Sequence, residues 1–233
     1  MCFLCVKPQA LRLVLCKSKQ MSPLRKRILL YLFGTVIVGF IILTLIVLAF
    51  PITGLDREFS EELQEYQLPF LDWLMKFVSW FGYMPYSLFT VLFAAGTFYL
   101  FKFKKEAFFV LLTLLSGIVS WGTKILVARP RPTESLVRIV EQAKNNSFPS
   151  GHVLFYVASF GFIALLMYWL KTSPTLIRVL VAGFCIFLCL TVPFSRVYLG
   201  AHWFTDVIAG FLLGMVCLLI VSYLYFRKPD SRF

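Results

Sequence analysis

The sequence predicts an all-α, polytopic membrane protein with six transmembrane helices and a candidate site at its extracytoplasmic face. Two observations predict this fold class. The chain has 233 residues, of which 60% are hydrophobic and only 15% are charged, and ordinary soluble domains are far less apolar. The apolar residues also gather in runs long enough to cross a bilayer, so a soluble helical bundle is a poor interpretation.

Six stretches of about 18 or more mostly apolar residues qualify as membrane-spanning helices. They are residues 28–50, 85–101, 107–128, 153–170, 176–194 and 204–226. The first follows a basic segment, as the apolar part of a signal peptide does, but its run is too long and no small-residue cleavage site follows it. We therefore expect an uncleaved span, and a chain made of a tail over 1–27, a six-helix domain over 28–226 and a tail over 227–233.

Basic residues are distributed asymmetrically among the connecting segments. If six helices alternate, one side receives the basic segments before residue 28, at 102–106, at 171–178 and after residue 226. The first connection on the other side, 51–84, is acidic. The positive-inside rule then places both termini in the cytoplasm, and we expect a multi-pass protein of the plasma membrane. Because topology accounts for most of the net charge of +12, we expect no nucleic-acid partner.

Three clusters of polar residues fall at the predicted outer ends of the spans. They are KILVARPRP at 124–132, FPSGH at 148–152 and SRVYLGAHWFTD at 195–206. Ionisable groups at the membrane are costly, so they need a partner or a function. Because three clusters from separate parts of the chain meet at one depth on one face, they indicate a site.

The second cluster has the features of a helix start. Pro149 and Gly151 favour a turn, and Ser150 is a suitable N-cap for a helix that begins near His152. A helix N-terminus offers free backbone N–H groups and a partial positive charge, and therefore binds anions. A plain helix cap with an incidental histidine is an equally good interpretation of this stretch alone.

The third cluster pairs a histidine with an acid. Gly200 breaks the preceding turn, and His202 and Asp206 are four residues apart, so they would share one face of a helix that begins near His202. A carboxylate beside an imidazole fixes its tautomer and leaves one ring nitrogen free to attack. Arg196 offers a planar fork of donors to an anion. The alternatives are a headgroup anchor at Arg196 and a purely structural His–Asp pair.

The first cluster adds two cations, Lys124 and Arg131. With Arg196, two histidines and a helix N-terminus against a single carboxylate, the predicted site attracts a compact dianion, for which phosphate is the natural candidate. No carboxylate cluster suited to magnesium or calcium accompanies these residues, so we expect no metal and no cofactor. Phosphoryl transfer to a histidine nucleophile fits this set of side chains.

Taken in order, the three clusters resemble the signature of the type 2 phosphatidic acid phosphatase superfamily: K-x6-R-P, then P-S-G-H, then S-R-x5-H-x3-D. Every position of the signature is filled between Lys124 and Asp206, and the likeness covers the last four predicted spans. The compact chain with short loops resembles bacterial members of this superfamily more than eukaryotic ones.

The resemblance implies a role for each matching residue. His202 attacks phosphorus and forms a phosphohistidine, Asp206 orients His202, and His152 protonates the leaving oxygen. The residues expected to bind the phosphate oxygens are Lys124, Arg131, Ser150, Gly151 and Arg196. Residue chemistry alone decides less firmly which histidine attacks, although the pairing with Asp206 favours His202.

The stretch ARPRP contains two arginines that differ in their expected roles. Only Arg131 has the superfamily spacing from Lys124, so we expect Arg131 to bind phosphate. We expect Arg129 to be an interfacial anchor or a supporting residue. Helical geometry does not separate the two arginines, because the prolines on either side disfavour helix here.

These features predict a membrane phosphatase that cleaves a lipid phosphate or diphosphate at the outer face, among membrane lipids. A lipid phosphotransferase of the same fold is the alternative. A transporter is a poor interpretation, because transporters bury charges near mid-membrane and these charges lie at span ends. The substrate stays open among undecaprenyl diphosphate, phosphatidylglycerol phosphate, phosphatidic acid and lipid A phosphate. The oligomeric state is also open, since Gly210 and Gly214 form a small-residue face suited to packing within or between chains.

One further helix is expected outside the spans. The apolar residues of PFLDWLMKFVSWFG, residues 69–82, follow helical spacing. This helix either lies on the outer leaflet beside the site or packs against the second span.

Overall fold

The computed structural model describes residues 23–171 and 174–227, which form nine helices and no strand. The helices are α2 (Pro23–Ala49), α3 (Gly54–Leu63), α4 (Pro69–Trp80), α5 (Tyr86–Leu100), α6 (Lys104–Leu112), α7 (Leu115–Val127), α8 (Gly151–Trp169), α9 (Thr175–Tyr198) and α10 (Phe204–Arg227). The described part of the chain divides into two compact units, with the boundary between Thr35 and Val36 inside α2. Most of the two predicted tails lies outside the described residues. The all-α prediction is confirmed for the described part of the chain.

Five helical segments in this part of the chain are long and apolar enough to cross a membrane. They are Arg27–Ala49, Lys104–Val127, Gly151–Trp169, Thr175–Tyr198 and Phe204–Arg227. The remaining predicted span corresponds to α5, which has 15 residues. At 1.5 Å per residue it is about 22 Å long, shorter than the ~30 Å hydrocarbon core of a bilayer. The helices are those of a polytopic membrane protein.

The predicted third span is interrupted near its middle. α6 ends at Leu112 and α7 begins at Leu115. Between them, the Thr113 hydroxyl donates to the carbonyl of Val110 at 2.6 Å and accepts from Ser159 of α8 at 2.9 Å. A hydroxyl that bonds back to the preceding turn competes with the helical hydrogen bonds, and Thr113 makes these contacts at the break.

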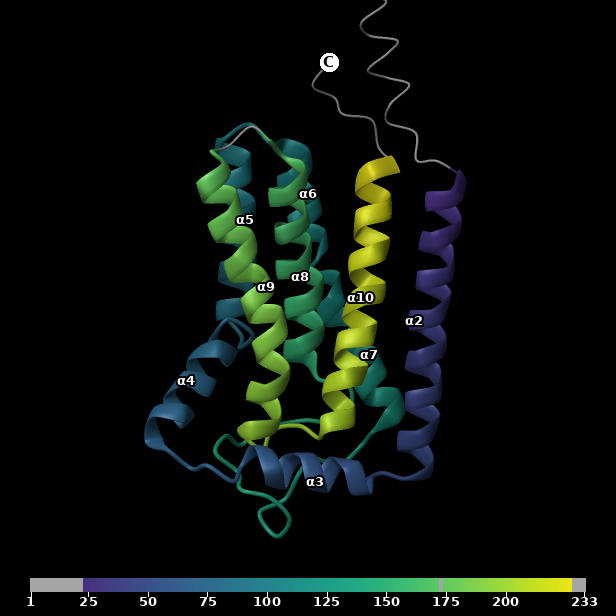
Figure 1. Cartoon of the computed structure of the whole chain (residues 1–233), viewed down its shortest axis with the longest axis vertical. Coiled ribbons are helices and arrows are strands. Elements are labelled where there is room, and N and C mark those ends of the chain that lie inside the picture. The colour runs from purple at the N-terminus through teal and green to yellow at the C-terminus, as the bar shows by residue number, and fades with distance from the viewer. Residues whose placement is uncertain (1–22, 172–173, 228–233) are drawn as a thin grey trace, which may run out of the picture. The chain divides into compact units, whose positions relative to one another are not determined.

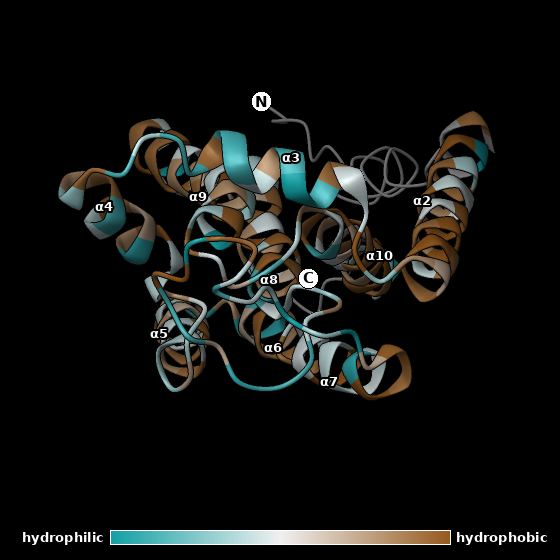
Figure 2. Cartoon of the chain, turned by 90° about the horizontal axis from the view of Figure 1, so that it is seen from below, coloured by the Kyte–Doolittle hydropathy of each residue, from teal (hydrophilic) through white to brown (hydrophobic). Residues whose placement is uncertain are grey.

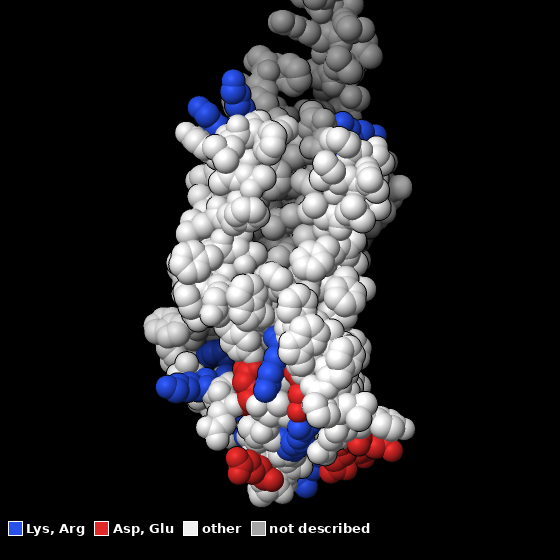
Figure 3. All heavy atoms as spheres, turned by 90° about the vertical axis from the view of Figure 1, so that its left-hand side faces the viewer, with Lys and Arg blue, Asp and Glu red and all other residues white. Residues whose placement is uncertain are grey.

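From α5 onward, consecutive helices alternate in direction, so their connections gather at two ends (Figure 1). At one end, Trp169 of α8 packs against Phe226 of α10 with ring centroids 4.9 Å apart. At the other end, the backbone N–H of Ser150 donates to the carbonyl of Asp206 at 2.9 Å. Figure 3 shows one face with charged side chains at these two ends and a broad uncharged band between them, as a lipid-facing surface requires.

Helix α8 is the central helix of the second unit. Its side chains Leu154, Tyr156, Phe162 and Leu166 are fully buried, and it contacts α6, α7, α9 and α10. Figure 2 shows α8 among these mostly apolar helices, seen from the end that carries α3. Because α8 starts at the second polar cluster, its packing fixes the position of that cluster.

Two glycines allow α10 to approach α8 closely. A Cβ atom at Gly210 would lie 2.6 Å from the carbonyl oxygen of Ser150, and one at Gly214 would lie 2.8 Å from Cβ of Val157. The small-residue face noted in the sequence therefore packs within the chain. This close approach brings the start of α10 next to the start of α8.

Helix α3 crosses the ends of α9 and α10 (Figure 1). Phe59 of α3 packs on Phe204 at the start of α10, with ring centroids 4.1 Å apart. At its other end, the side-chain amide of Gln64 donates to the carbonyl of Tyr198, the last residue of α9, at 2.8 Å. α3 is thus held at both helices whose ends carry the third polar cluster.

The helix expected over 69–82 is present as α4, and it packs against α9. Phe70, Trp73 and Phe77 are exposed and lie in a continuous row, with successive ring centroids 6.1 and 5.7 Å apart. On this helix Asp72 bonds to Arg138 at 2.6 Å, and this contact holds the pKa of Asp72 below its ordinary value. α4 therefore has an exposed aromatic row and a polar attachment to the loop that follows α7.

Substitution of Gly210 tests the close packing of α8 and α10. Gly210→Ala should lower the free energy of unfolding by about 1–3 kcal/mol, because the added Cβ meets a backbone oxygen that cannot rotate away. Gly183→Ala in α9 is the matched control, since nothing lies within 4 Å of a Cβ at that position. Thermal unfolding in detergent should show a lower midpoint for the first variant alone, and equal midpoints would contradict the packing described here.

Candidate active site

The predicted His–Asp pair lies at the start of α10. His202 belongs to the turn before this helix, and Asp206 is the third residue within it. The helix therefore begins after His202, and the two side chains meet across the turn instead of sharing one helical face. His202 Nδ1 lies 3.5 Å from Asp206 Oδ2, and both side chains are buried. The two side chains lie close together, but His202 Nδ1 makes no hydrogen bond in the described structure; catalytic contacts often tighten only when substrate binds.

The carboxylate of Asp206 is also fixed by neighbours other than His202. Asp206 Oδ2 accepts from the backbone N–H of Trp203 at 2.9 Å, a favourable position for an acid in the first turn of a helix. The Ser147 hydroxyl donates to the same oxygen. The orientation of Asp206 is therefore set by the helix start and by the loop before α8.

Arg131 lies beside the His202 ring, and Lys124 bonds to the same loop as Arg131. Arg131 Nη1 is 3.3 Å from His202 Nε2, the ring nitrogen that faces away from Asp206. The remaining donors of Arg131 and the ammonium of Lys124 bond to backbone carbonyls of residues 144–147 and 201. Burial, and then the nearby Arg196, lower the pKa of Arg131 to about 10, so its guanidinium keeps its charge at neutral pH.

The second cluster places a histidine and a hydroxyl at the start of α8. Ser150 occupies the N-cap position, as expected, but its side chain makes no capping bond. Its buried Oγ and the buried Nε2 of His152 have no hydrogen-bond partner within the described chain. A Cβ at Gly151 would lie 3.0 Å from the Ser120 hydroxyl, so glycine lets this helix start approach α7. The two unpaired groups are suited to a polar ligand.

The turn between α4 and α5 packs directly on His152, which the sequence analysis did not predict. The Tyr83 ring contacts the imidazole edge to face, with ring centroids 4.6 Å apart. A Cβ at Gly82 would lie 2.3 Å from Cδ2 of His152. Nothing in the spacing of residues 81–85 signals this contact, because it depends on how α4 packs against α9.

Arg196 is buried, and its fork of donors holds a carboxylate. Nη2 donates to Glu141 Oε1 at 3.0 Å, and Nη1 donates to Glu141 Oε2 at 3.2 Å. The Tyr83 hydroxyl accepts from Nη1 at 2.8 Å and donates to Glu141. Arg196 is therefore no headgroup anchor, because 1% of its side chain is exposed.

The sequence analysis counted one carboxylate, Asp206, among the residues of the predicted site, and the structure adds two more close to it. Glu141 is paired with Arg196 and Asp56 is paired with Arg129, which adds two acids to Asp206. Burying several cations together is costly unless each has a counter-charge. Because each buried cation needs a counter-charge, the sequence of the flanking loops could have been searched for acids that supply it.

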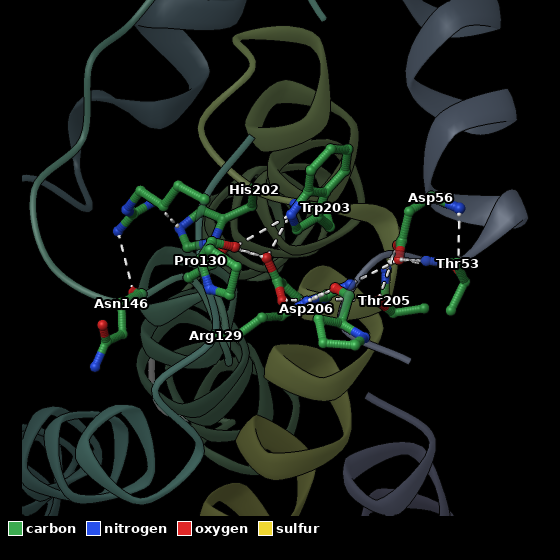
Figure 4. A network of polar contacts seen from close by, with 12 residues as sticks. Thr53, Asp56, Arg129, Pro130, Asn146, His202, Trp203, Thr205 and Asp206 are labelled. Carbon is green, nitrogen blue, oxygen red and sulfur yellow. Dashed lines mark hydrogen bonds and ion pairs between the residues drawn. The ribbon is translucent and has the colours of Figure 1, made fainter. Parts of the chain in front are cut away.

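Arg129 is not an interfacial anchor, because it is only 2% exposed. Figure 4 shows it between two acids, Asp56 of α3 and Asp206 of α10. Nη2 lies 2.7 Å from Asp56 Oδ2, and Nη1 donates to Asp206 Oδ1. Losing one partner of a buried ion pair typically costs about 3–5 kcal/mol. The alternative role expected for Arg129, a supporting residue, agrees with these contacts.

The surroundings of His202 favour its neutral form. Burial, and then the cations Arg131, Lys124 and Arg196, hold the pKa of His202 well below its ordinary value. A neutral imidazole whose one nitrogen faces a carboxylate has its other nitrogen free to attack an electrophile.

An open cavity of about 410 Å³ lies on the loop side of these residues. Its walls include Arg131, Ile139, Glu141, Gln142, Gly200 and Ala201. The cavity therefore gives access from the loop side to Arg131, which lies beside His202, and to Glu141, which is bonded to Arg196.

The fold and the site define a class of protein: a helical membrane protein with a buried histidine between one carboxylate and three cations. Residues 105–230 match the PAP2 superfamily, and the chain belongs to this family. The match covers all three polar clusters.

Two curated relatives are similar over most of the chain. The undecaprenyl-diphosphatase of Sulfolobus acidocaldarius is 29% identical over 169 residues, which are 69% of this chain and 74% of the relative. Phosphatidylglycerophosphatase B of Bacillus subtilis is 28% identical over 192 residues, which are 78% of this chain and 89% of the relative.

Two solved structures share the fold. The PAP2-type phosphatidylglycerolphosphate phosphatase of Bacillus subtilis has a TM-score of 0.76 at 21% identity, covering 86% of this chain and 98% of that one. LpxE of Aquifex aeolicus has a TM-score of 0.56 at 21% identity, covering 71% of this chain and 93% of that one.

Proposed function

We propose that the protein is an integral membrane phosphatase that hydrolyses a lipid phosphate or lipid diphosphate through a phosphohistidine at His202, without a metal ion. The observation that carries the proposal is the position of the His202 ring. Its Nδ1 lies 3.5 Å from Asp206, and its Nε2 faces the opposite way and lies 3.3 Å from the guanidinium of Arg131. A phosphate placed there would be neutralised by its surroundings and would lie in reach of the nucleophile.

In the proposed reaction, His202 Nε2 attacks phosphorus, and the bond between phosphorus and the lipid oxygen breaks. Protonated His152 gives its proton to that leaving oxygen. Asp206 stabilises the positive charge that develops on the His202 ring. Water then attacks the phosphohistidine, neutral His152 takes its proton, and the phosphorus–nitrogen bond breaks to release inorganic phosphate and free His202.

The phosphate oxygens would be bound by Lys124, Arg131, Ser150, Gly151 and Arg196. The unpaired Oγ of Ser150 supports this assignment, as does Arg131, which lies 3.3 Å from His202 Nε2. Arg196 presents its fork to Glu141, and a guanidinium fork fits a carboxylate and a phosphate equally well. Phosphate binding would therefore displace Glu141, because two anions on one fork repel each other.

The proposed substrate class rests on the family and on the relatives. Their names specify undecaprenyl diphosphate and phosphatidylglycerophosphate. Both are lipids with a terminal phosphoryl group, and the cationic groups proposed here bind that group instead of the lipid chain. We therefore propose the lipid phosphoryl headgroup as the recognised feature.

The function is tested by phosphate release from a panel of lipid phosphates and diphosphates in detergent. We expect release by the wild-type protein, inhibition by vanadate, and a trapped phosphohistidine that His202→Ala lacks. Added EDTA should leave the rate unchanged. Loss of activity in EDTA with recovery in magnesium would contradict the metal-free mechanism. Transfer of the phosphoryl group to an added alcohol in preference to water would indicate a phosphotransferase.

Substitution of Glu141 tests whether it competes with phosphate for Arg196. Glu141→Gln keeps the shape of the side chain but removes its charge, so inorganic phosphate should inhibit the enzyme about tenfold more strongly, a difference of about 1.4 kcal/mol. Glu134→Gln is the matched control, because Glu134 borders the same cavity and is not bonded to Arg196. Weaker inhibition of the Glu141 variant would mean that Glu141 positions Arg196 instead of competing with phosphate.

We also propose six crossings with both termini in the cytoplasm and the site outside, in the plasma membrane. Each of α2, α5, α8, α9 and α10 would cross once, and α6 with α7 would cross together. The basic connections 102–106 and 171–178, opposite the acidic segment 51–84, support this orientation. The domain would cover 28–226 between two cytoplasmic tails. The exposed aromatic row of α4 suits the outer membrane surface.

Cysteine labelling tests this orientation. In a background without native cysteines, Ser135→Cys in the loop after α7 should react with an impermeant maleimide in intact cells. Lys104→Cys at the start of α6 should react only after permeabilisation. Both positions are exposed, so a failure to react reports the membrane barrier. The reverse pattern would overturn the proposed orientation.

A further inference from the structure

Asp206 belongs to the family signature, but its polar contacts reach residues outside that signature. Arg129 joins Asp206 to Asp56, and the three side chains form a buried ion triplet (Figure 4). Asp56 is 0% exposed, Arg129 is 2% exposed and Asp206 is 0% exposed. The Arg129 Nε also donates to the carbonyl of Pro51 at 2.7 Å. These side chains are too buried and too fully bonded to act as a headgroup anchor.

Asp56 is itself held from both sides. Within α3, Thr53 and Asp56 form a capping box. Across the interface, Asp56 Oδ1 accepts from the backbone N–H of Thr205 at 2.9 Å and from its hydroxyl at 2.8 Å. Thr205 directly precedes Asp206. One acid of α3 therefore fixes the first turn of α10 on which Asp206 is placed.

The charge balance of the triplet affects Asp206. Two carboxylates and one guanidinium carry a net charge of −1. If Arg129 had Asp206 as its only acidic partner, the two charges would cancel beside His202. Because Asp56 shares the guanidinium, a net negative charge remains in the triplet, where it stabilises the positive charge that develops on His202.

We propose that Asp56 and Arg129 are positioning residues for the nucleophilic histidine and act on it through Asp206. The inference rests on the phosphohistidine mechanism proposed above. Neither side chain contacts His202 in the described structure, and neither belongs to the signature K-x6-R-P, P-S-G-H and S-R-x5-H-x3-D. Their effect is to orient the carboxylate and to set the negative charge behind the imidazole.

The proposal predicts opposite shifts of the pH profile for the two single variants. His202 must be neutral to attack, so activity falls as pH drops through its pKa. The fall of activity on the acidic side of the pH profile is its acid limb. Asp56→Asn removes a negative charge and lowers the pKa of His202, so it moves the acid limb to lower pH. Arg129→Gln removes a positive charge and moves the acid limb to higher pH. Each shift should be roughly half a pH unit or more.

The other charged groups around His202 stay the same in every variant. They are Lys124 of α7, Arg131 of the following loop, His152 of α8, Arg196 of α9 and Asp206 of α10. A difference between variants therefore reports the triplet. The double variant Asp56→Asn with Arg129→Gln restores the net charge of −1, so its acid limb should return close to the wild-type position.

The experiment measures kcat, KM and the acid limb of kcat for the wild type, both single variants and the double variant, at equal folded yield. We expect each single variant to lose about 10–100-fold in kcat, the range typical of residues that orient metal ligands, with a smaller change in KM. The matched controls are Asp72→Asn and Arg138→Gln. They remove the same charges from a pair that bonds to neither Asp206 nor His202, and they should keep the wild-type limb.

Two results would overturn the proposal. One is an acid limb that does not move or moves in the same direction in both single variants. The other is a kcat within about twofold of wild type. If Arg129→Gln does not fold, Asp56→Asn decides alone through the direction of its shift. A wild-type protein that forms no phosphohistidine would refute the proposed function instead, and that measurement is made first.

Discussion

The carboxylate of Asp206 is the group on which the arrangement of this end of the molecule depends. A buried carboxylate is stable only when its oxygens are satisfied by donors. Its donors come from three places: Trp203 in the turn, Ser147 in the loop before α8, and Arg129 in the loop after α7. One buried charge thereby ties the start of α10 to both ends of the loop over 128–150, and it leaves His202 facing the other cations.

The arginines near Asp206 and His202 divide into two groups by their partners. Arg129 has two buried acids and no free direction, so its contacts are permanent parts of the fold. Arg131 bonds mostly to backbone carbonyls, and Arg196 bonds to Glu141, whose side chain is 19% exposed. A phosphate oxygen can replace a carbonyl or a partly exposed acid as the partner of an arginine. This exchange leaves no buried charge without a partner. The same residue type thus holds the fold at one position and is available to a ligand at another.

Sequence patterns predicted what depends on local chemistry. Apolar runs located the helices, and the three clusters located Lys124, His152 and His202 at one end. The patterns missed partners that tertiary packing selects. Arg129 bonds to Asp56, 73 residues away, and a Pro-flanked arginine at a helix end ordinarily lies at the membrane surface. The break in the third span falls at a threonine, which unlike proline does not mark a break by itself.

The segment between α2 and α5 supports the site, although it lies outside the residues that match the family. That match begins at residue 105, yet α3 fixes the start of α10 through Asp56, and the turn before α5 packs on His152 through Gly82 and Tyr83. The two histidines are therefore supported by two different parts of one connecting segment. Because each part bonds to backbone or to a buried charge, the segment supports the geometry of His152 and His202 from outside the matched region. Contacts outside the matched region can for this reason determine where His152 and His202 lie.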